Sequence, residues 1–182
     1  LFLDLKFHDI PNTVAGAVRA ACAMSPFLMT IHAGGGAAMI AAAAQAATDG
    51  AETGAVARPN ILAVTVLTSM DQTDLQSVGV AHSPSDQVRR LAALAQRNGA
   101  DGVVCSPLEI DVLRGDLGPD FLLVVPGIRP AGAESGDQKR VMSPADAVTL
   151  GASFLVIGRP ITQATDPAAA ARAIASELSS PV

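Results

Sequence analysis

The stretch LFLDLKFHDIPNT, residues 1–13, places one lysine and two aspartates at the junction of a predicted strand and a predicted helix. Successive side chains of an extended strand alternate between its faces, so we expect Asp4 and Lys6 to share one face. A strand this rich in Leu and Phe is predicted to be buried on both sides, where opposite charges are tolerated only in pairs. Pro11 ends the extended run, and a small-residue helical pattern begins at Thr13. The charged residues therefore lie at the carboxyl end of a strand.

Strand-like and helix-like segments alternate along the rest of the chain. Short runs of aliphatic and β-branched residues predict strands, while Ala-rich or amphipathic stretches predict helices. After the first strand, the predicted strands span 27–33, 60–67, 102–106, 121–127 and 154–158. The predicted helices span 13–24, 37–48, 85–98, 107–114 and 167–178, and Ser143 before Pro144 is the N-cap of another. Residues 49–59 and 128–142 have loop composition.

This alternation predicts an α/β protein with a parallel sheet covered by helices, either an open doubly wound sheet or an eightfold barrel. The glycines at 34–36 do not have the G-x-G-x-x-G spacing of a dinucleotide-binding turn. Polar residues instead follow several strands, as a barrel active site requires. We expect a single TIM (β/α)8 barrel domain over residues 1–182, with about six βα units here and the first two strands upstream of Leu1.

Composition narrows the class of protein. With 182 residues and 49% hydrophobic content, the chain can bury one sizeable core. The formal net charge of -5 argues against nucleic acid or an anionic membrane surface as a partner. Cys22 and Cys105 have no disulfide or zinc spacing, which favours a reducing cytoplasm. No apolar run reaches the roughly 18 residues that a membrane span needs.

Asp4, Lys6 and Asp9 form the first candidate site. Only two lysines occur against ten arginines, so a lysine inside an apolar strand is unlike the usage in the rest of the chain. The three charges are either an array around a reacting centre or a structural salt bridge at a strand end. In the first case, a protonated lysine can stabilise a developing carbanion and then donate a proton to it.

A second candidate site follows the last two predicted strands. The motifs PGIRP at 126–130 and GRPIT at 158–162 each combine a glycine with an arginine. Glycine lets backbone N–H groups approach a ligand, and arginine binds phosphate bidentately. Arg129, Gly158 and Arg159 therefore predict a phosphate site, with Gln138 as a further donor, although both arginines could also be ordinary surface residues.

Three other polar residues have weaker signals. Thr68 ends a strand and is either a ligand contact or a cap. His8 lies in the turn between Lys6 and Asp9 without a defined role, and His32, beside the glycine turn, is better explained as a structural histidine.

Several motifs in this order resemble one known family. They are D-x-K-x-x-D-I-P-N-T at 4–13, L-T-S at 67–69, P-G-I-R-P at 126–130, G-D-Q at 136–138 and I-G-R-P-I-T at 157–162. Together they are similar to the bacterial type of orotidine 5'-phosphate decarboxylase, over essentially the whole chain. The D-x-K-x-x-D pattern alone is shared with a wider suprafamily.

The resemblance implies a dimeric (β/α)8 barrel that converts orotidine 5'-phosphate to UMP and CO2 without a metal or organic cofactor. Lys6 would then protonate C6 of the pyrimidine, with Asp4 beside the departing group. The other implied site residues would contact the neighbouring subunit's site (Asp9, Ile10 and Thr13), the pyrimidine (Thr68) or the phosphate (Arg129, Gln138, Gly158 and Arg159).

The family also uses an aspartate after its first strand and a lysine after its second, and this sequence has no counterpart of either. We expect both upstream of Leu1, and we expect the 182-residue piece alone to have little or no activity. Two alternatives stay open: a magnesium-dependent relative that acts on sugar phosphates, such as a keto-gulonate phosphate decarboxylase or hexulose phosphate synthase, and a non-catalytic phosphate-binding or dimerisation module.

Overall fold

Six parallel strands form one sheet in the computed structural model, which describes residues 1–130 and 141–179. The strands are β1 (Phe2–Phe7), β2 (Leu28–His32), β3 (Asn60–Val64), β4 (Gly102–Val104), β5 (Leu122–Val125) and β6 (Phe154–Leu155). Their spatial order is their sequence order, β1 to β6, and every neighbouring pair is parallel. A doubly wound sheet would reverse this order at a switch point. The sequential order confirms the prediction of a partial barrel.

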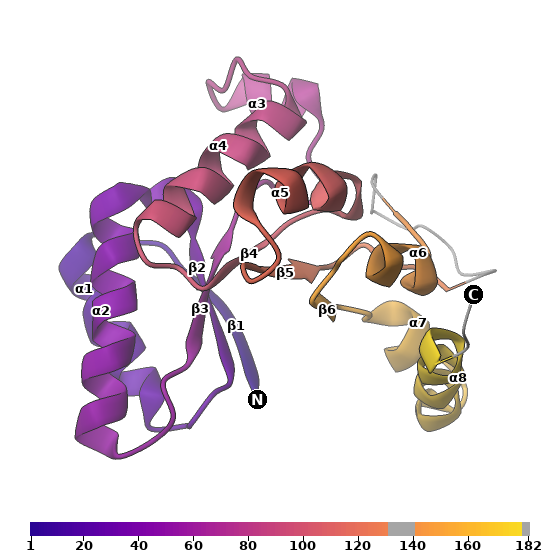
Figure 1. Ribbon diagram of the computed structural model, residues 1–182, viewed down its shortest axis with the longest axis horizontal. Coiled ribbons are helices and arrows are strands. Elements are labelled where there is room, and N and C mark those ends of the chain that lie inside the picture. Colours follow the sequence, from indigo (N-terminus) through magenta and orange to yellow (C-terminus); the bar gives the residue numbers. More distant parts are fainter. Residues whose placement is uncertain (131–140, 180–182) are drawn as a thin grey trace.

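Helices cover the outer face of the curved sheet, and Figure 1 shows the resulting arch, with its two limbs at the α1–α2 and α8 ends. The α-helices are α1 (Pro11–Cys22), α2 (Gly36–Gly54), α3 (Gln72–Ser77), α4 (Pro84–Arg97), α5 (Ile110–Leu117), α6 (Pro144–Thr149), α7 (Arg159–Thr162) and α8 (Pro167–Ser179). Two short 3-10 turns, η1 (Ala33–Gly35) and η2 (Pro107–Glu109), follow β2 and β4. In the described residues, no helix is both long and apolar enough to cross a bilayer.

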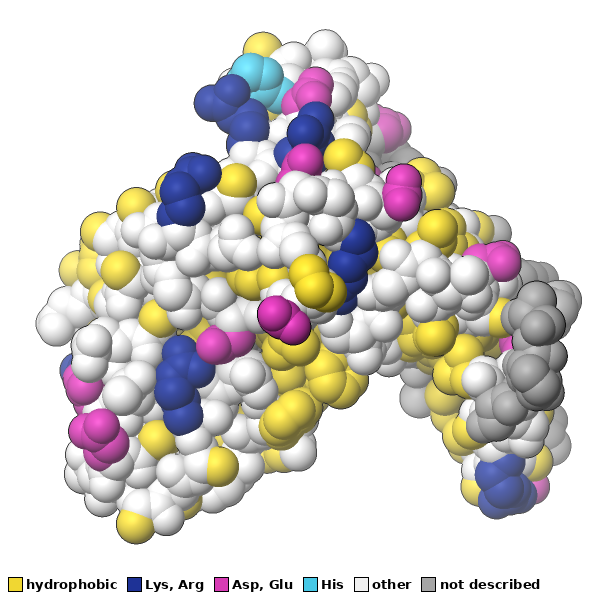
Figure 2. Space-filling model, viewed as in Figure 1, with side chains coloured by type: hydrophobic (Ala, Val, Ile, Leu, Met, Phe, Trp, Pro, Cys, Tyr) yellow, Lys and Arg dark blue, Asp and Glu magenta, His cyan; other side chains and the backbone are white. Residues whose placement is uncertain are grey.

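The core has two layers, as a barrel requires. The larger cluster of buried residues lies between sheet and helices and includes Met29, Ile61 and Leu123. A smaller cluster on the inner face of the sheet is built around Leu28, Leu62 and Val124. Hydrophobic side chains also gather along the concave side of the arch in the space-filling view (Figure 2).

The sheet curls enough to bring distant strands together at its amino-terminal edge. The rings of Phe27, before β2, and Phe154, at the start of β6, make an edge contact with centroids 5.8 Å apart. Such curvature makes the inner face of the sheet concave, which is the geometry of a barrel wall.

The predicted loop at 49–59 is wrong in its first half, because α2 continues to Gly54. Packing explains the extension: α2 lies against α1, and a Cβ at Gly50 would come within 2.9 Å of the Cys22 sulfur. The close approach of the two helices keeps this turn helical against its weak propensity. The helix ends at Gly54, and the C-cap residue Ala55 adopts the left-handed conformation.

The prediction that the first strand is buried on both sides is also wrong, since Leu5 is 51% exposed. In the described sheet β1 has a single neighbour, β2, so one of its edges has no strand beside it. The predicted N-cap at Ser143 is confirmed, because its hydroxyl accepts from the Asp146 amide at 3.2 Å.

Candidate active site

A bulge in β1 shapes the first candidate site. Leu3 pairs with Met29 and Phe7 pairs with Ile31, so residues 4–6 of β1 stand opposite the single residue Thr30 of β2. Within the bulge, Lys6 has φ of 51°, a left-handed conformation that costs a non-glycine residue about 1–3 kcal/mol. Regular strand alternation, the assumption behind the sequence prediction, therefore does not hold at this point.

The bulge nevertheless brings the predicted pair together. The Lys6 ammonium lies 2.5 Å from Oδ2 of Asp4, and the two side chains are 39% and 47% exposed. The Thr30 hydroxyl donates to Oδ1 of Asp4 at 3.0 Å and accepts from the Lys6 amide at 2.9 Å. Both carboxylate oxygens are thus engaged, and the charges lie at the carboxyl end of the strand as predicted.

Asp4 and Lys6 line a cavity of about 260 Å³ on the inner face of the sheet. Apolar side chains form most of its wall, among them Phe2, Val64, Val66, Val104 and Val156. Thr68, which follows β3 and is 9% exposed, lies in the same wall together with Ser69. An ion pair beside an apolar wall offers a ligand two opposite charges where few other polar groups compete.

The remaining residues of the opening motif lie outside this cavity. Asp9, Ile10 and Thr13 are exposed at the start of α1, and Oδ1 of Asp9 accepts from the Ile10 amide at 2.6 Å. Ile10 is 66% exposed. The structure therefore separates Asp9 from Asp4 and Lys6.

The predicted phosphate residues follow two adjacent strands. Arg129 comes after β5, with its guanidinium donating to the Ile128 carbonyl at 2.8 Å, and Gly158 and Arg159 form the N-cap and first residue of α7 after β6. Because β5 and β6 are parallel neighbours, both segments lie at the same edge of the sheet. Gln138 lies outside the described residues.

Two histidines flank the charged pair. The rings of His8 and His32 lie 5.3 Å apart, with His32 at the end of β2. Burial lowers the pKa of His32, and the neighbouring positive charges of His8 and Lys6 lower it further, against the opposing effect of Asp4. A neutral His32 fits the structural role that its sequence position indicates.

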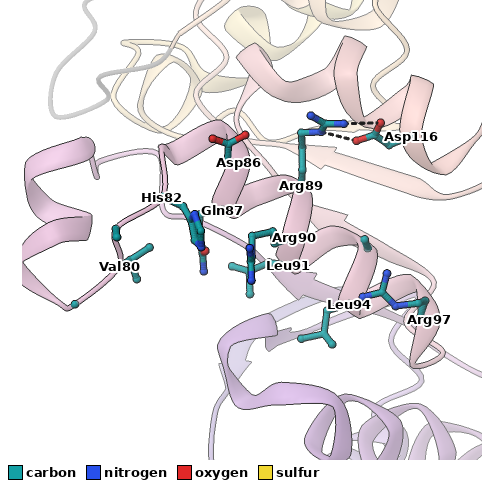
Figure 3. A pocket seen from close by; sticks show the side chains of 13 residues that line it. Val80, His82, Asp86, Gln87, Arg89, Arg90, Leu91, Leu94, Arg97 and Asp116 are labelled. Carbon is teal, nitrogen blue, oxygen red and sulfur yellow. Dashed lines mark hydrogen bonds and ion pairs between the residues drawn. The ribbon is translucent and has the colours of Figure 1, made fainter.

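A larger hollow of about 950 Å³ lies elsewhere, along α4 and the segment before it (Figure 3). Arg90, Leu91 and Arg97 of α4 line it, and none of the predicted site residues does. At its rim Arg89 makes a forked pair with Asp116 at 2.6 and 3.0 Å, and these hydrogen bonds lower the pKa of the Asp116 carboxyl. This pair joins α4 to α5 on the outer surface, away from the cavity beside Lys6.

Comparison with known proteins gives the site its context. The Orotidine 5'-phosphate decarboxylase / HUMPS family matches residues 1–174. The chain belongs to this family. An orotidine 5'-phosphate decarboxylase of Rhodospirillum rubrum is 61% identical over 178 residues, which are 98% of this chain and 72% of the relative. Another, from Paramagnetospirillum magneticum, is 57% identical over 178 residues, 98% of this chain and 76% of the relative.

The family's fold is seen directly in a solved structure. The crystal structure of orotidine 5'-phosphate decarboxylase from Lactobacillus acidophilus has a TM-score of 0.83 and 43% sequence identity, and the match covers 98% of this chain and 75% of that one. The six strands described here therefore correspond to most of an orotidine 5'-phosphate decarboxylase barrel.

Sequence reasoning missed Thr30, whose hydroxyl hydrogen-bonds both the Asp4 carboxylate and the Lys6 backbone amide. It is fully buried in β2, between the equally buried Met29 and Ile31. The available signal was its polarity, since it is the one hydroxyl in the strand LMTIH. A threonine is also a good strand former, which is why that signal was not distinctive.

Proposed function

We propose that this protein is an orotidine 5'-phosphate decarboxylase, which converts orotidine 5'-phosphate to UMP and CO2 in pyrimidine nucleotide synthesis. One observation carries the proposal: the Lys6 ammonium and the Asp4 carboxylate form an ion pair on the wall of a largely apolar cavity at the carboxyl ends of the strands. The names of the two relatives described above support the same substrate. The substrate is a small molecule and no cofactor takes part.

The proposed chemistry needs one positive group at the reacting carbon. The bond between C6 of the pyrimidine and its carboxylate breaks, CO2 leaves, and the electron pair stays on C6. The ammonium of Lys6 stabilises this charge and then gives C6 a proton, and solvent later returns a proton to the lysine. Asp4 lies beside the departing carboxylate and keeps the ammonium in place.

The wall of the cavity suits this reaction. Valines from β3, β4 and the segment after β6 surround the charged pair, so a bound pyrimidine ring replaces water there. Thr68 contacts the pyrimidine in our proposal, which its position in the same wall supports. Few mobile water dipoles then compete with the fixed charges of the site.

We assign the phosphate to Arg129, Gly158 and Arg159, with Gln138 as a further donor. The arginines follow neighbouring strands, and Gly158 at the N-cap of α7 carries no side chain that would stand between the backbone and a ligand. Binding of this remote group can supply energy that is used at the reacting carbon. A protein with a formal net charge of -5 can hold an anionic substrate in this way, because the arginines supply positive charge locally at the phosphate.

We further propose a homodimer in which Asp9, Ile10 and Thr13 complete the site of the other subunit. The three residues are exposed at the start of α1 and lie outside the cavity that Asp4 and Lys6 of the same subunit line, which supports this assignment. We place the enzyme in the cytoplasm, which suits two buried cysteines that form no disulfide.

The test is an assay of the full-length gene product, with orotidine 5'-phosphate as substrate and UMP and CO2 measured as products. We expect turnover without added metal and a kcat lowered by about 10³- to 10⁴-fold after Lys6→Ala, while UMP still binds. Magnesium-dependent activity on a sugar phosphate, with none on orotidine 5'-phosphate, would assign the protein to the other branch of the family. Binding of UMP without any turnover by the wild type would instead identify a non-catalytic module.

A further inference from the structure

We propose that Thr30 is a positioning residue of this active site, which holds the Asp4 carboxylate and the backbone of Lys6 in their working arrangement. The inference rests on the proposed decarboxylation and names a residue that acts on the reaction only through Asp4 and Lys6. Thr30 itself does not line the cavity.

The first argument is the direction of the two hydrogen bonds. The Thr30 hydroxyl accepts from the Lys6 amide, so its own hydrogen is free to point to Oδ1 of Asp4. One side chain thereby connects the two residues that carry the proposed chemistry. With Oδ1 fixed at 3.0 Å by Thr30, Oδ2 is directed at the Lys6 ammonium.

The second argument is the backbone of Lys6. Its left-handed conformation is unfavourable for a residue with a side chain, and it persists only where the surroundings hold it. The bulge takes residues 4–6 out of regular pairing with β2, so the Lys6 amide has no carbonyl of a regular ladder opposite it. The Thr30 hydroxyl accepts from the Lys6 amide instead of a carbonyl, and this contact fixes the position of the Lys6 backbone from which the side chain extends.

The third argument is the burial of Thr30. The residue is fully buried and lies between apolar residues, where valine would fill the same space without a polar group. A hydroxyl in this position stabilises the protein only through its two hydrogen bonds, and both involve Asp4 or Lys6. Thr65, also buried, differs because its hydroxyl donates to the Val104 carbonyl within the sheet.

The experiment compares Thr30→Val with Thr30→Ser in the full-length protein, with Thr65→Val as the matched control. All three are assayed for kcat and KM with orotidine 5'-phosphate. Loss of a hydrogen bond to a charged group predicts that Thr30→Val lowers kcat by about 10- to 100-fold and changes KM by less than about threefold. Thr30→Ser keeps the hydroxyl and should retain kcat within about threefold, and Thr65→Val should keep kcat at the wild-type value.

A double-mutant cycle separates positioning from a general packing role. If Thr30 acts through the Asp4 carboxylate, the penalty of Thr30→Val should shrink in an Asp4→Ala background, where no side-chain oxygen is left to accept from Thr30 and only the contact with the Lys6 amide is still lost. An equal penalty in both backgrounds, or the same loss in Thr30→Ser as in Thr30→Val, would overturn the proposal. Thr30→Ala, which also removes the hydroxyl, takes the place of the valine variant if that variant does not fold.

The outcomes distinguish this inference from the proposed function. A wild-type protein without turnover on orotidine 5'-phosphate would refute the function itself. An active wild type whose Thr30→Val variant is equally active would leave the function standing and refute the positioning role of Thr30 alone.

Discussion

Two cations of this chain, Lys6 and Arg114, lie at opposite edges of the same sheet and use their charge differently. The Lys6 ammonium, at the carboxyl end of β1, pairs with one carboxylate beside a cavity. Arg114 of α5 lies near the amino ends of β5 and β6 and donates to the carbonyls of Gly118, Pro119, Phe121 and Gly151 and to the hydroxyl of Ser153.

The difference follows from what surrounds each group. Arg114 donates to backbone oxygens of the loops that lead into β5 and β6, so its guanidinium holds those loops together. Lys6 lies on a bulge, in a strained conformation, next to empty space. In other barrels stability depends on the amino-terminal edge of the sheet and catalysis on the carboxyl-terminal edge, and the roles that we propose for Arg114 and Lys6 follow that division.

The largest expected effect is on turnover and comes from Lys6→Ala. Removing the proposed proton donor should lower kcat by about 10³- to 10⁴-fold. The free energy of unfolding should change by less than about 1 kcal/mol, because the Lys6–Asp4 pair is well exposed and contributes little to stability. Steady-state assays and urea unfolding of the full-length protein measure the two quantities. The exposed Arg97 of α4 provides the control, since Arg97→Ala should change neither.

A Lys6→Ala protein that unfolds much more easily than the wild type would break the comparison. In that case the ion pair beside the cavity would be a structural salt bridge, the alternative that the sequence left open.

The next effect is on stability and comes from Arg114→Ala. Loss of a charged donor shared by four carbonyls and a hydroxyl should destabilise the fold by about 2–4 kcal/mol. Arg114→Lys should recover little of this loss, because an ammonium cannot reproduce the planar fork. The urea midpoint measures both variants, and kcat of the folded enzyme should stay at the wild-type value.

Arg172→Ala on the exposed face of α8 is the control for Arg114, with an expected change of less than about 0.5 kcal/mol. Wild-type stability in Arg114→Ala would show that the loops before β5 and β6 are held by other contacts.

The fold was largely predictable from the sequence because its signals are local. Apolar runs, Pro residues at helix starts and the cap at Ser143 each act over a few residues, and the strands occur where these signals place them. The C-terminal part of α2 was not predictable in this way. Its last turns depend on Gly50 packing against Cys22, 28 positions away in the sequence, and propensity does not contain that contact.

In the candidate site, too, the features set by nearby residues were predictable and those set by distant residues were not. The spacing of Asp4 and Lys6 predicted that the two side chains lie close together, and they do, but through a bulge and a left-handed Lys6 instead of the regular alternation on which the prediction rested. The bulge and the role of Thr30 depend on the register between β1 and β2, which no single strand encodes. The residues alone grouped Asp9 with Asp4 and Lys6, whereas the family resemblance assigned Asp9 to the neighbouring subunit's site, and its position outside the cavity is compatible with the second prediction.

The smallest expected effect is a pH dependence at the carboxyl-terminal edge, from His32. Burial and the nearby charges of His8 and Lys6 hold the pKa of His32 below the ordinary 6.5. The unfolded chain therefore takes up a proton on His32 more readily than the folded protein does. The stability associated with a neutral His32 is fully present above pH 6.5 and is lost as the pH falls through the lowered pKa of the folded state.

Urea midpoints at pH near 7 and near 5 test this assignment. His32→Gln should lose less stability on acidification than the wild type, whereas the exposed His82, changed to Gln, should leave the wild-type loss unchanged. Arg114→Lys should also keep the wild-type pH dependence of stability, because none of the groups to which Arg114 donates belongs to a histidine. If His32→Gln loses as much stability on acidification as the wild type does, the acid sensitivity does not come from His32. The two edges of the sheet would then not differ in the pH dependence of stability.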